Sequence, residues 1–252
     1  MDVMNLIESL FRWIHVVAGI MWIGHLYYFN FVNSQFEPTL DAETKKKVIP
    51  ELRPRALYWF RWGAAFTWVT GVLIALMVFY HGAIALEDPS AGWTIGALLT
   101  IVVTFTSFLL YDFLAKTAIK DPQQQFIAGI VFAAVFVFFA KIVGGFSPRG
   151  YAIHLGALFG TAMAYNVWFR IWPAQQQIIT AIKNGQAPDP ALVALAGSRS
   201  KHNTYMSVPL VFLMLNAHNF WAYNPIAVIV MVAIGFFGTY HLYNHAPKVK
   251  GF

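Results

Sequence analysis

Apolar segments long enough to cross a lipid bilayer recur along the whole chain. A transmembrane helix needs about 20 predominantly apolar residues. The segments lie at about residues 6–31, 57–80, 93–115, 126–143, 150–172, 205–220 and 225–245. This pattern predicts an all-α protein, a polytopic integral membrane helical bundle of about seven transmembrane helices.

The composition supports this interpretation. Of 252 residues, 58% are hydrophobic and 11% are charged, and the mean hydropathy is +0.57. A soluble domain would carry about 25% charged residues. We therefore expect a single membrane domain over residues 1–252, with the lipid bilayer as its surroundings.

The chain has no cysteine. Disulfides, iron–sulfur clusters, thiolate catalysis and a covalent c-type haem, which needs C-x-x-C-H, are thereby excluded. The net charge of +6 does not indicate a nucleic-acid partner. In a membrane protein such an excess usually lies in cytoplasmic loops.

Basic residues predict the orientation. If seven spans alternate across the membrane, fourteen of the 17 Lys and Arg residues fall on one side. The positive-inside rule then places the N-terminus outside and the C-terminus in the cytoplasm. The loop 82–92, which holds Glu87 and Asp88 and no basic residue, fits an outside position. Two long inner loops, 32–56 and 173–204, are candidates for surface helices.

Four histidines from four different spans are predicted to lie in the outer half of the membrane. His15 lies about nine residues into the first span, roughly 13 Å at the rise of an α-helix. His154 lies near the outer start of the fifth span. His81 and His218 lie at the outer ends of the second and sixth spans.

The other histidines fall towards the inner side. His25 follows His15 by ten residues, about 15 Å along one helix, so the two cannot share one metal ion. His25 and His241 are candidates for an inner site, while His202 and His245 lie in or near inner loops.

Intramembrane imidazoles indicate a cofactor. Burying an ionisable group costs several kcal/mol unless it is paired or liganded. Neutral imidazole is the commonest metal ligand and a standard axial ligand of haem iron. We expect one or two b-type haems, with the outer iron held through His15, His154 and His218, and Gly19 leaving room for a flat macrocycle. Copper is an alternative, as are hydrogen-bonded histidines without any metal.

Two arginines lie at the inner ends of spans. Arg61 in "WFRW" and Arg170 in "WFRIWP" are candidates to bind an anionic substrate or a haem propionate, because guanidinium binds carboxylates bidentately. The alternative is a place in the aromatic belt at the membrane surface.

The first and fifth spans also echo one another. The first runs His15, Gly19, Gly24 and then "YYFNF", and the fifth runs His154, Gly156, Gly160 and then "YNVWF". Parallel duplication of this kind occurs in transport folds.

Four stretches carry a resemblance to a known family. They are "RWIHVVAGIMWIGHLYYFNFVN", "LYWFRWGAAFTWVTGVL", "GALFGTAMAYNVWFRIWPAQQQII" and "SRSKHNTYMSVPLVFLMLNAHN". The chain resembles the membrane domain of the bacterial membrane-bound urate hydroxylases, the urate oxidase N-terminal family, over nearly its whole length. The resemblance implies oxidation of urate to 5-hydroxyisourate in the inner membrane. It also implies about eight helices and a C-terminal c-type cytochrome domain that takes the electrons.

The sequence departs from that pattern because it shows seven spans and no C-x-x-C-H. The expected function is therefore a urate hydroxylase-like, haem b-containing redox protein of the bacterial cytoplasmic membrane. It would pass electrons from a reduced small molecule, urate-like or a quinol, to a separate periplasmic c-type cytochrome. The resemblance carries over His15, His154 and His218, which lie in matching stretches, as candidate redox-site residues.

Two other functions stay open. The chain can be an accessory membrane subunit of a larger respiratory or oxidase complex, or of a homo-oligomer. It can also be a transporter for a small anion, with Arg170 and the histidines lining the path.

Overall fold

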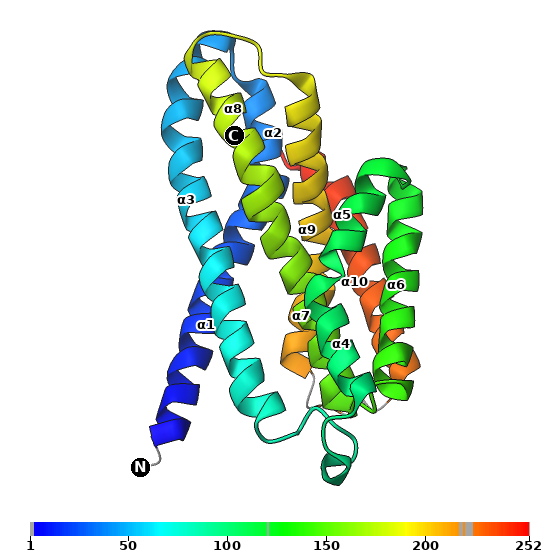
Figure 1. Cartoon of the computed structure of the whole chain (residues 1–252). Coiled ribbons are helices and arrows are strands. Elements are labelled where there is room, and N and C mark those ends of the chain that lie inside the picture. Colours follow the sequence, from blue (N-terminus) through cyan, green and yellow to red (C-terminus); the bar gives the residue numbers. More distant parts are fainter. Residues whose placement is uncertain (1–2, 120, 217–218, 220–223, 252) are drawn as a thin grey trace. The chain divides into compact units, whose positions relative to one another are not determined.

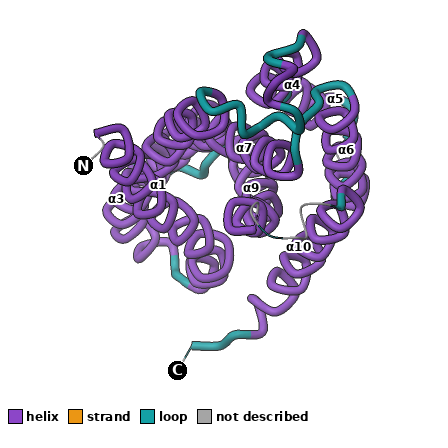
Figure 2. The backbone as a smooth tube through the Cα atoms, turned by 90° about the horizontal axis from the view of Figure 1, so that it is seen from below, coloured by secondary structure: helices purple, strands orange, loops and turns teal. Residues whose placement is uncertain are grey.

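The computed structural model describes residues 3–119, 121–216, 219 and 224–251. Within them every named element is helical and there is no β-strand, as Figure 2 shows. The longer helices, labelled in Figure 1, are α1 (Val3–Tyr27), α3 (Ala42–Ile74), α4 (Ile95–Thr106), α5 (Phe108–Thr117), α6 (Pro122–Ile142), α7 (Pro148–Asn166), α8 (Trp172–Lys183), α9 (Pro190–Asn216) and α10 (Pro225–His245). The short elements are α2 (Ser34–Phe36) and the 3-10 turns η2 (Glu37–Thr39), η4 (Pro89–Ala91) and η7 (Ala246–Lys248).

Several of these helices are suited to a membrane. In the described part of the chain, four stretches are long and apolar enough to cross one: Val3–Thr39, Ala42–Tyr80, Gln123–Ile142 and Pro225–Lys248. The pair α4 and α5, bent by 46° at a short break, passes the same test together and counts as a fifth if it forms one span. Large apolar side chains such as Trp13, Ile142 and Phe237 are exposed on these helices, as lipid contact requires. The protein is therefore an all-helical membrane protein, and the count of seven spans stays a prediction.

The fifth and sixth predicted spans are also helical. Residues 150–172 fall on α7, on η5 (Val167–Ile171) and on the first residue of α8, and residues 205–216 fall on the C-terminal part of α9. Neither helix is among the four apolar stretches. On α7 the polar residues His154, Thr161 and Asn166 are buried. A helix face that contacts protein instead of lipid need not be apolar, so hydropathy alone underrates such a helix.

The helices begin where side chains accept hydrogen bonds from their first amides. Asp41 accepts from the Thr44 amide (2.9 Å) at the start of α3. Thr94 does the same at α4 through Ala97 (3.1 Å), and Asp121 at α6 through Gln124 (2.9 Å). These caps satisfy amides that have no partner inside the helix. The segment 32–56, expected as a loop with a surface helix, is largely helical, because α3 begins at Ala42 and continues directly into the second span.

Three of the long helices contain or lead into π-helical turns: η1 (Tyr28–Asn33), η3 (Ala75–Tyr80) and η5 (Val167–Ile171). Such turns hold an extra residue and frequently occur at functional sites. The motifs "YYFNF" and "YNVWF" that echo one another in the sequence overlap η1 and η5. The two segments that are similar in sequence therefore also have similar local backbone structure.

The chain forms two compact units. Unit 1 comprises Met1–Thr70, Met163–Tyr205 and Thr239–Phe252, and unit 2 comprises Gly71–Ala162 and Met206–Gly238. In unit 1, α1 and α3 meet at Gly63, where an added Cβ would lie 2.9 Å from the Trp22 amide nitrogen and 3.1 Å from the Ala18 carbonyl oxygen. Close approach at small residues is the usual way in which membrane helices pack.

Unit 2 contains α4 to α6, most of α7, the second half of α9 and most of α10. Its loop before η4 packs on the start of α7. The Ala85 carbonyl accepts from the Ser147 amide (2.8 Å) and lies so close to Gly150 that no Cβ would fit there. An isolated antiparallel bridge joins Leu86 to Phe146. These contacts enclose the first turn of α7.

We expect Gly63→Ala to lower the stability of the protein by about 1–3 kcal/mol, because the added methyl group meets backbone atoms that cannot rotate away. The measurement is the thermal unfolding midpoint of the detergent-purified chain. Gly24→Ala on α1 is the matched control, since an added Cβ there meets nothing within 4 Å. Equal midpoints for the two variants would contradict this account of the helix crossing.

Candidate functional site

A cavity of about 610 Å³ lies in unit 1. Its walls come from η1, α3, η5, α8 and the first half of α9, which are far apart in the sequence. Apolar side chains form most of the lining, among them Phe29, Leu57, Phe60, Ile171 and Ile178. The Phe29 and Phe60 rings meet edge to face with centroids 5.6 Å apart. The cavity thus combines apolar walls with a small polar cluster.

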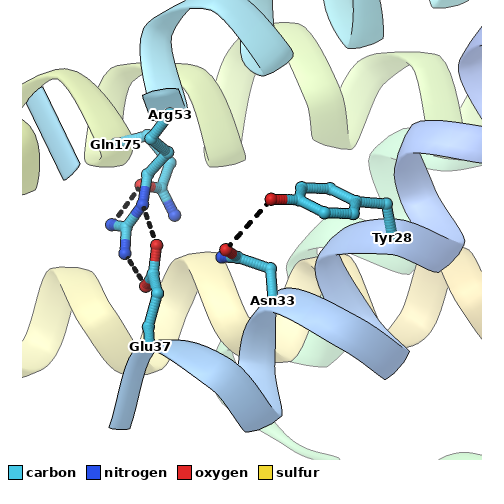
Figure 3. Close-up of polar contacts among 5 residues, drawn as sticks. All are labelled: Tyr28, Asn33, Glu37, Arg53 and Gln175. Atoms are coloured by element: carbon cyan, nitrogen blue, oxygen red, sulfur yellow. Dashed lines mark hydrogen bonds and ion pairs between the residues drawn. The ribbon is translucent and has the colours of Figure 1, made fainter. Parts of the chain in front are cut away.

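The centre of the polar cluster is Arg53. Its Nε donates to Glu37 Oε1 (3.2 Å), a second nitrogen forms a close ion pair with Glu37 Oε2, and Nη1 donates to Gln175 Oε1 (3.1 Å), as Figure 3 shows. The side chains of Arg53 and Glu37 are 12% and 19% exposed. These bonds use three of the five N–H groups of a guanidinium. Further donors of Arg53 therefore remain for another molecule.

The π-helical turn η1 supplies a second part of the wall. Asn30 donates to the Leu26 carbonyl and to Ser200 Oγ, both at 2.8 Å, and accepts from the Tyr243 hydroxyl (2.8 Å). Asn33 accepts from the Tyr28 hydroxyl (3.4 Å), a contact drawn in Figure 3. Asn30 thus joins α1 to α9 and α10 beside the cavity.

His15 is held in one tautomer. Its Nδ1 lies 2.9 Å from the Thr67 carbonyl oxygen and 3.3 Å from Thr70 Oγ1. A carbonyl oxygen only accepts, so Nδ1 carries the proton and Nε2 has the lone pair. This is the arrangement that a metal-ligating histidine adopts.

His25 has the same arrangement. Its Nδ1 donates to the Met21 carbonyl (2.7 Å) of the preceding turn, which again leaves the lone pair on Nε2. His15 and His25 both belong to α1 and to unit 1.

His154 in unit 2 has hydrogen bonds at both ring nitrogens. Nδ1 donates to the Gly150 carbonyl (2.7 Å), so Nε2 accepts from the Tyr80 hydroxyl (2.9 Å). The residue is 1% exposed, and its ring packs against Phe146 with centroids 4.5 Å apart. If His154 is to ligate a metal through Nε2, the Tyr80 hydroxyl must first move away.

The remaining candidate histidines are less enclosed. His81 is exposed directly after η3, and His241 is exposed on α10 with its ring stacked on that of His245 (centroids 6.4 Å apart). His218 lies outside the described residues. Among the residues that the structure describes, no three His, Asp or Glu side chains form a group suited to a metal ion.

The two candidate arginines contact aromatic rings. The Arg61 guanidinium lies 3.6 Å from the centroid of the Trp172 ring and 5.5 Å from that of Trp168. Arg170 donates to the Tyr165 hydroxyl (2.7 Å) and lies 5.1 Å from the centre of the same ring. These are the cation–π contacts expected of an aromatic belt.

Reasoning from the sequence missed the Arg53 cluster. Arg53 is 122 residues from Gln175, and no spacing rule connects them. Gln175 does lie in the stretch "WPAQQQII" that carries the family resemblance, but that resemblance gave it no role.

Comparison with known proteins identifies one family. The profile of the urate oxidase N-terminal family matches residues 1–47 and 41–250, which is nearly the whole chain. No curated protein and no solved structure matches. The length of the matched region is sufficient to show that the chain belongs to the urate oxidase N-terminal family.

Proposed function

We propose that the protein is a membrane-bound oxidoreductase similar to the urate hydroxylases. It oxidises a reduced small molecule, urate-like or a quinol, and passes the electrons to a separate c-type cytochrome at the outer face of the bacterial inner membrane. The observation that carries the proposal is the family match over residues 41–250. The tautomer of His15, with Nε2 ready to bind a metal, supports the redox character.

Two histidines of unit 1 support the proposal of a b-type haem there. An axial ligand needs a neutral imidazole whose Nδ1–H is held by an acceptor, and both His15 and His25 meet this condition. Their separation of about 15 Å along α1 suits an outer and an inner haem. An added Cβ at Gly19 would have no neighbour nearer than Thr67 at 3.8 Å, so there is room along the helix beside His15.

The roles of the chain's own residues follow from these contacts. The Thr67 carbonyl fixes the orientation of the His15 ring, and the Met21 carbonyl fixes that of His25. A haem bound there would accept and release one electron at a time. In unit 1 we propose His241 as a residue from which a second axial ligand comes, and Arg61 and Arg170 as partners for the propionates. His154 and His81 in unit 2 stay candidate ligands.

The proposed topology has seven spans, with the N-terminus outside and the C-terminus in the cytoplasm. It rests on the distribution of Lys and Arg. This orientation places the half of the first span that carries His15 near the outer face, where a periplasmic cytochrome can accept electrons.

A second candidate function is the transport of a small anion. The observation that favours it is the cavity in unit 1, which Lys45 and Arg53 line together with apolar side chains. A haem spectrum in the isolated chain favours the oxidoreductase, and uptake of an anion by vesicles that contain a haem-free chain favours the transporter.

We expect the detergent-purified protein to show a reduced-minus-oxidised α-band of a b-type haem, and His15→Ala to weaken or abolish it, because the variant removes an axial ligand. His245→Ala is the control, since His245 is exposed at the last residue of the last predicted span. A flat spectrum of the unmodified chain, together with an empty metal analysis, would contradict the redox function of the isolated protein. Other subunits that co-purify in that case would favour the accessory role.

The topology can be tested by cysteine labelling. The chain has no cysteine, so an introduced cysteine is the only thiol that reacts. We expect Ala91→Cys to react with a membrane-impermeant maleimide on intact spheroplasts, and Gln186→Cys to react only after permeabilisation. Both positions are exposed, so accessibility reports the side of the membrane. The reverse pattern would overturn the proposed orientation.

A further inference from the structure

We propose that the unit 1 cavity around Arg53 binds a planar heterocyclic anion whose edge carries carbonyl oxygens. This deepens the proposed function, on which the choice of urate as the probe rests. The cavity lies at the end of the first and second spans where Lys45 and Glu37 are found. In the proposed topology that end faces the cytoplasm, so the anion would enter from there.

The first argument is the burial of the charged pair. Arg53 and Glu37 are largely shielded from solvent. Removing two charges from water costs several kcal/mol per ion, and a buried ion pair often adds nothing to stability compared with apolar residues. The pair is therefore poorly explained as a stabilising contact, whereas a fixed guanidinium in a cavity wall is well suited to bind an anion.

The second argument is the direction of the hydrogen bonds. A guanidinium has only donors, so the oxygen of the Gln175 amide must face Arg53. The NH₂ group of Gln175 is then left as a pair of donors. Glu37, the acidic group of the cluster, already accepts two bonds from Arg53. Arg53 and Gln175 therefore offer donors to a ligand that presents acceptors.

The third argument is the shape and charge of the cavity. A volume of about 610 Å³ falls in the range of small-molecule sites, about 300–1,000 Å³. Phe29 and Phe60 line it, and the face of an aromatic ring can stack on a planar ligand. Lys45 adds a second positive charge, which attracts anions. Urate, a planar anion with carbonyl oxygens around its rings, has all the required features.

The test measures binding of radiolabelled urate to the full-length protein in lipid nanodiscs by equilibrium dialysis. We expect Gln175→Glu to weaken binding about ten- to hundredfold, because a carboxylate replaces two donors next to the anion. The new carboxylate can still accept the Arg53 hydrogen bond, so the fold is retained. Arg53→Gln should have an effect of similar size.

The matched control is Arg55→Gln. Arg55 is two residues from Arg53 on the same helix and also pairs with a glutamate, Glu51, but the two side chains are 70% and 71% exposed. We expect this variant to bind urate within about twofold of the unmodified protein, since an exposed pair contributes little. Size-exclusion profiles check folding, and Gln175→Glu carries the test if Arg53→Gln does not fold.

Competition defines the ligand class. Adenine, a neutral purine with an amino donor at its edge, should not displace urate. Acetate at the same concentration should not displace it either. Displacement by acetate, or equal effects of Arg53→Gln and Arg55→Gln, would overturn the proposed site, as would the absence of urate binding to the unmodified protein.

Failure of this inference can be separated from failure of the proposed function, because binding is measured without a redox readout. A protein that shows the haem band and is reduced by a quinol, but does not bind urate, retains the redox function without this site. A protein that binds urate through Arg53 and Gln175 but has no haem retains the site without the redox function.

Discussion

Polar groups in the apolar parts of this protein must find partners inside the protein, because lipid offers none. In unit 1 this requirement joins helices that are distant in sequence. His15 on α1 bonds to the Thr67 carbonyl on α3, and Asn30 bonds to Ser200 on α9 and to Tyr243 on α10. The few polar side chains therefore determine which helices meet and in which register.

For the same reason, a polar group with a hydrogen-bond donor or a lone pair left over is a candidate to bind a ligand. His15 and His25 each have one ring nitrogen held by a carbonyl oxygen, so the other nitrogen carries a lone pair in a defined direction. Arg53 and Gln175 have donors left after they bind one another. His154 differs, since Gly150 and Tyr80 bond to both of its nitrogens. A donor or lone pair that is left over in apolar surroundings marks a residue suited to bind a ligand. A residue whose polar atoms all bond to other helices serves to join them.

The sequence predicted those elements of the fold that depend on local composition. Runs of apolar residues predicted the helices α1, α6 and α10, because each lies in a stretch long and apolar enough to cross a membrane. The bend between α4 and α5 was not predicted, since the apolar run 93–115 continues through it. The continuity of α3 with the second span was not predicted, because the charged residues and three prolines of 32–56, two of which lie inside α3, favour a loop.

The candidate site residues were predictable only where local composition singles them out. A histidine inside an apolar span stands out in the sequence, so His15 could be proposed, but its partner Thr67 is 52 residues away. Arg53 looked like one more cytoplasmic positive charge, because its burial and its contact with Gln175 arise only from the packing of α3 on α8.

The π-helical turn η1 makes the cavity depend on the length of the chain as well as on its residues. One additional residue corresponds to about 100° of rotation about a helix axis. The helix before η1 exposes Trp13 and Ile20, whereas η1 itself buries Asn30 and Asn33. Loss of a single residue from this turn would restore a regular α-helix and swing Glu37 by more than a quarter of a turn from the direction of Arg53. Here insertions and deletions, more than substitutions, are the changes that would abolish the cavity.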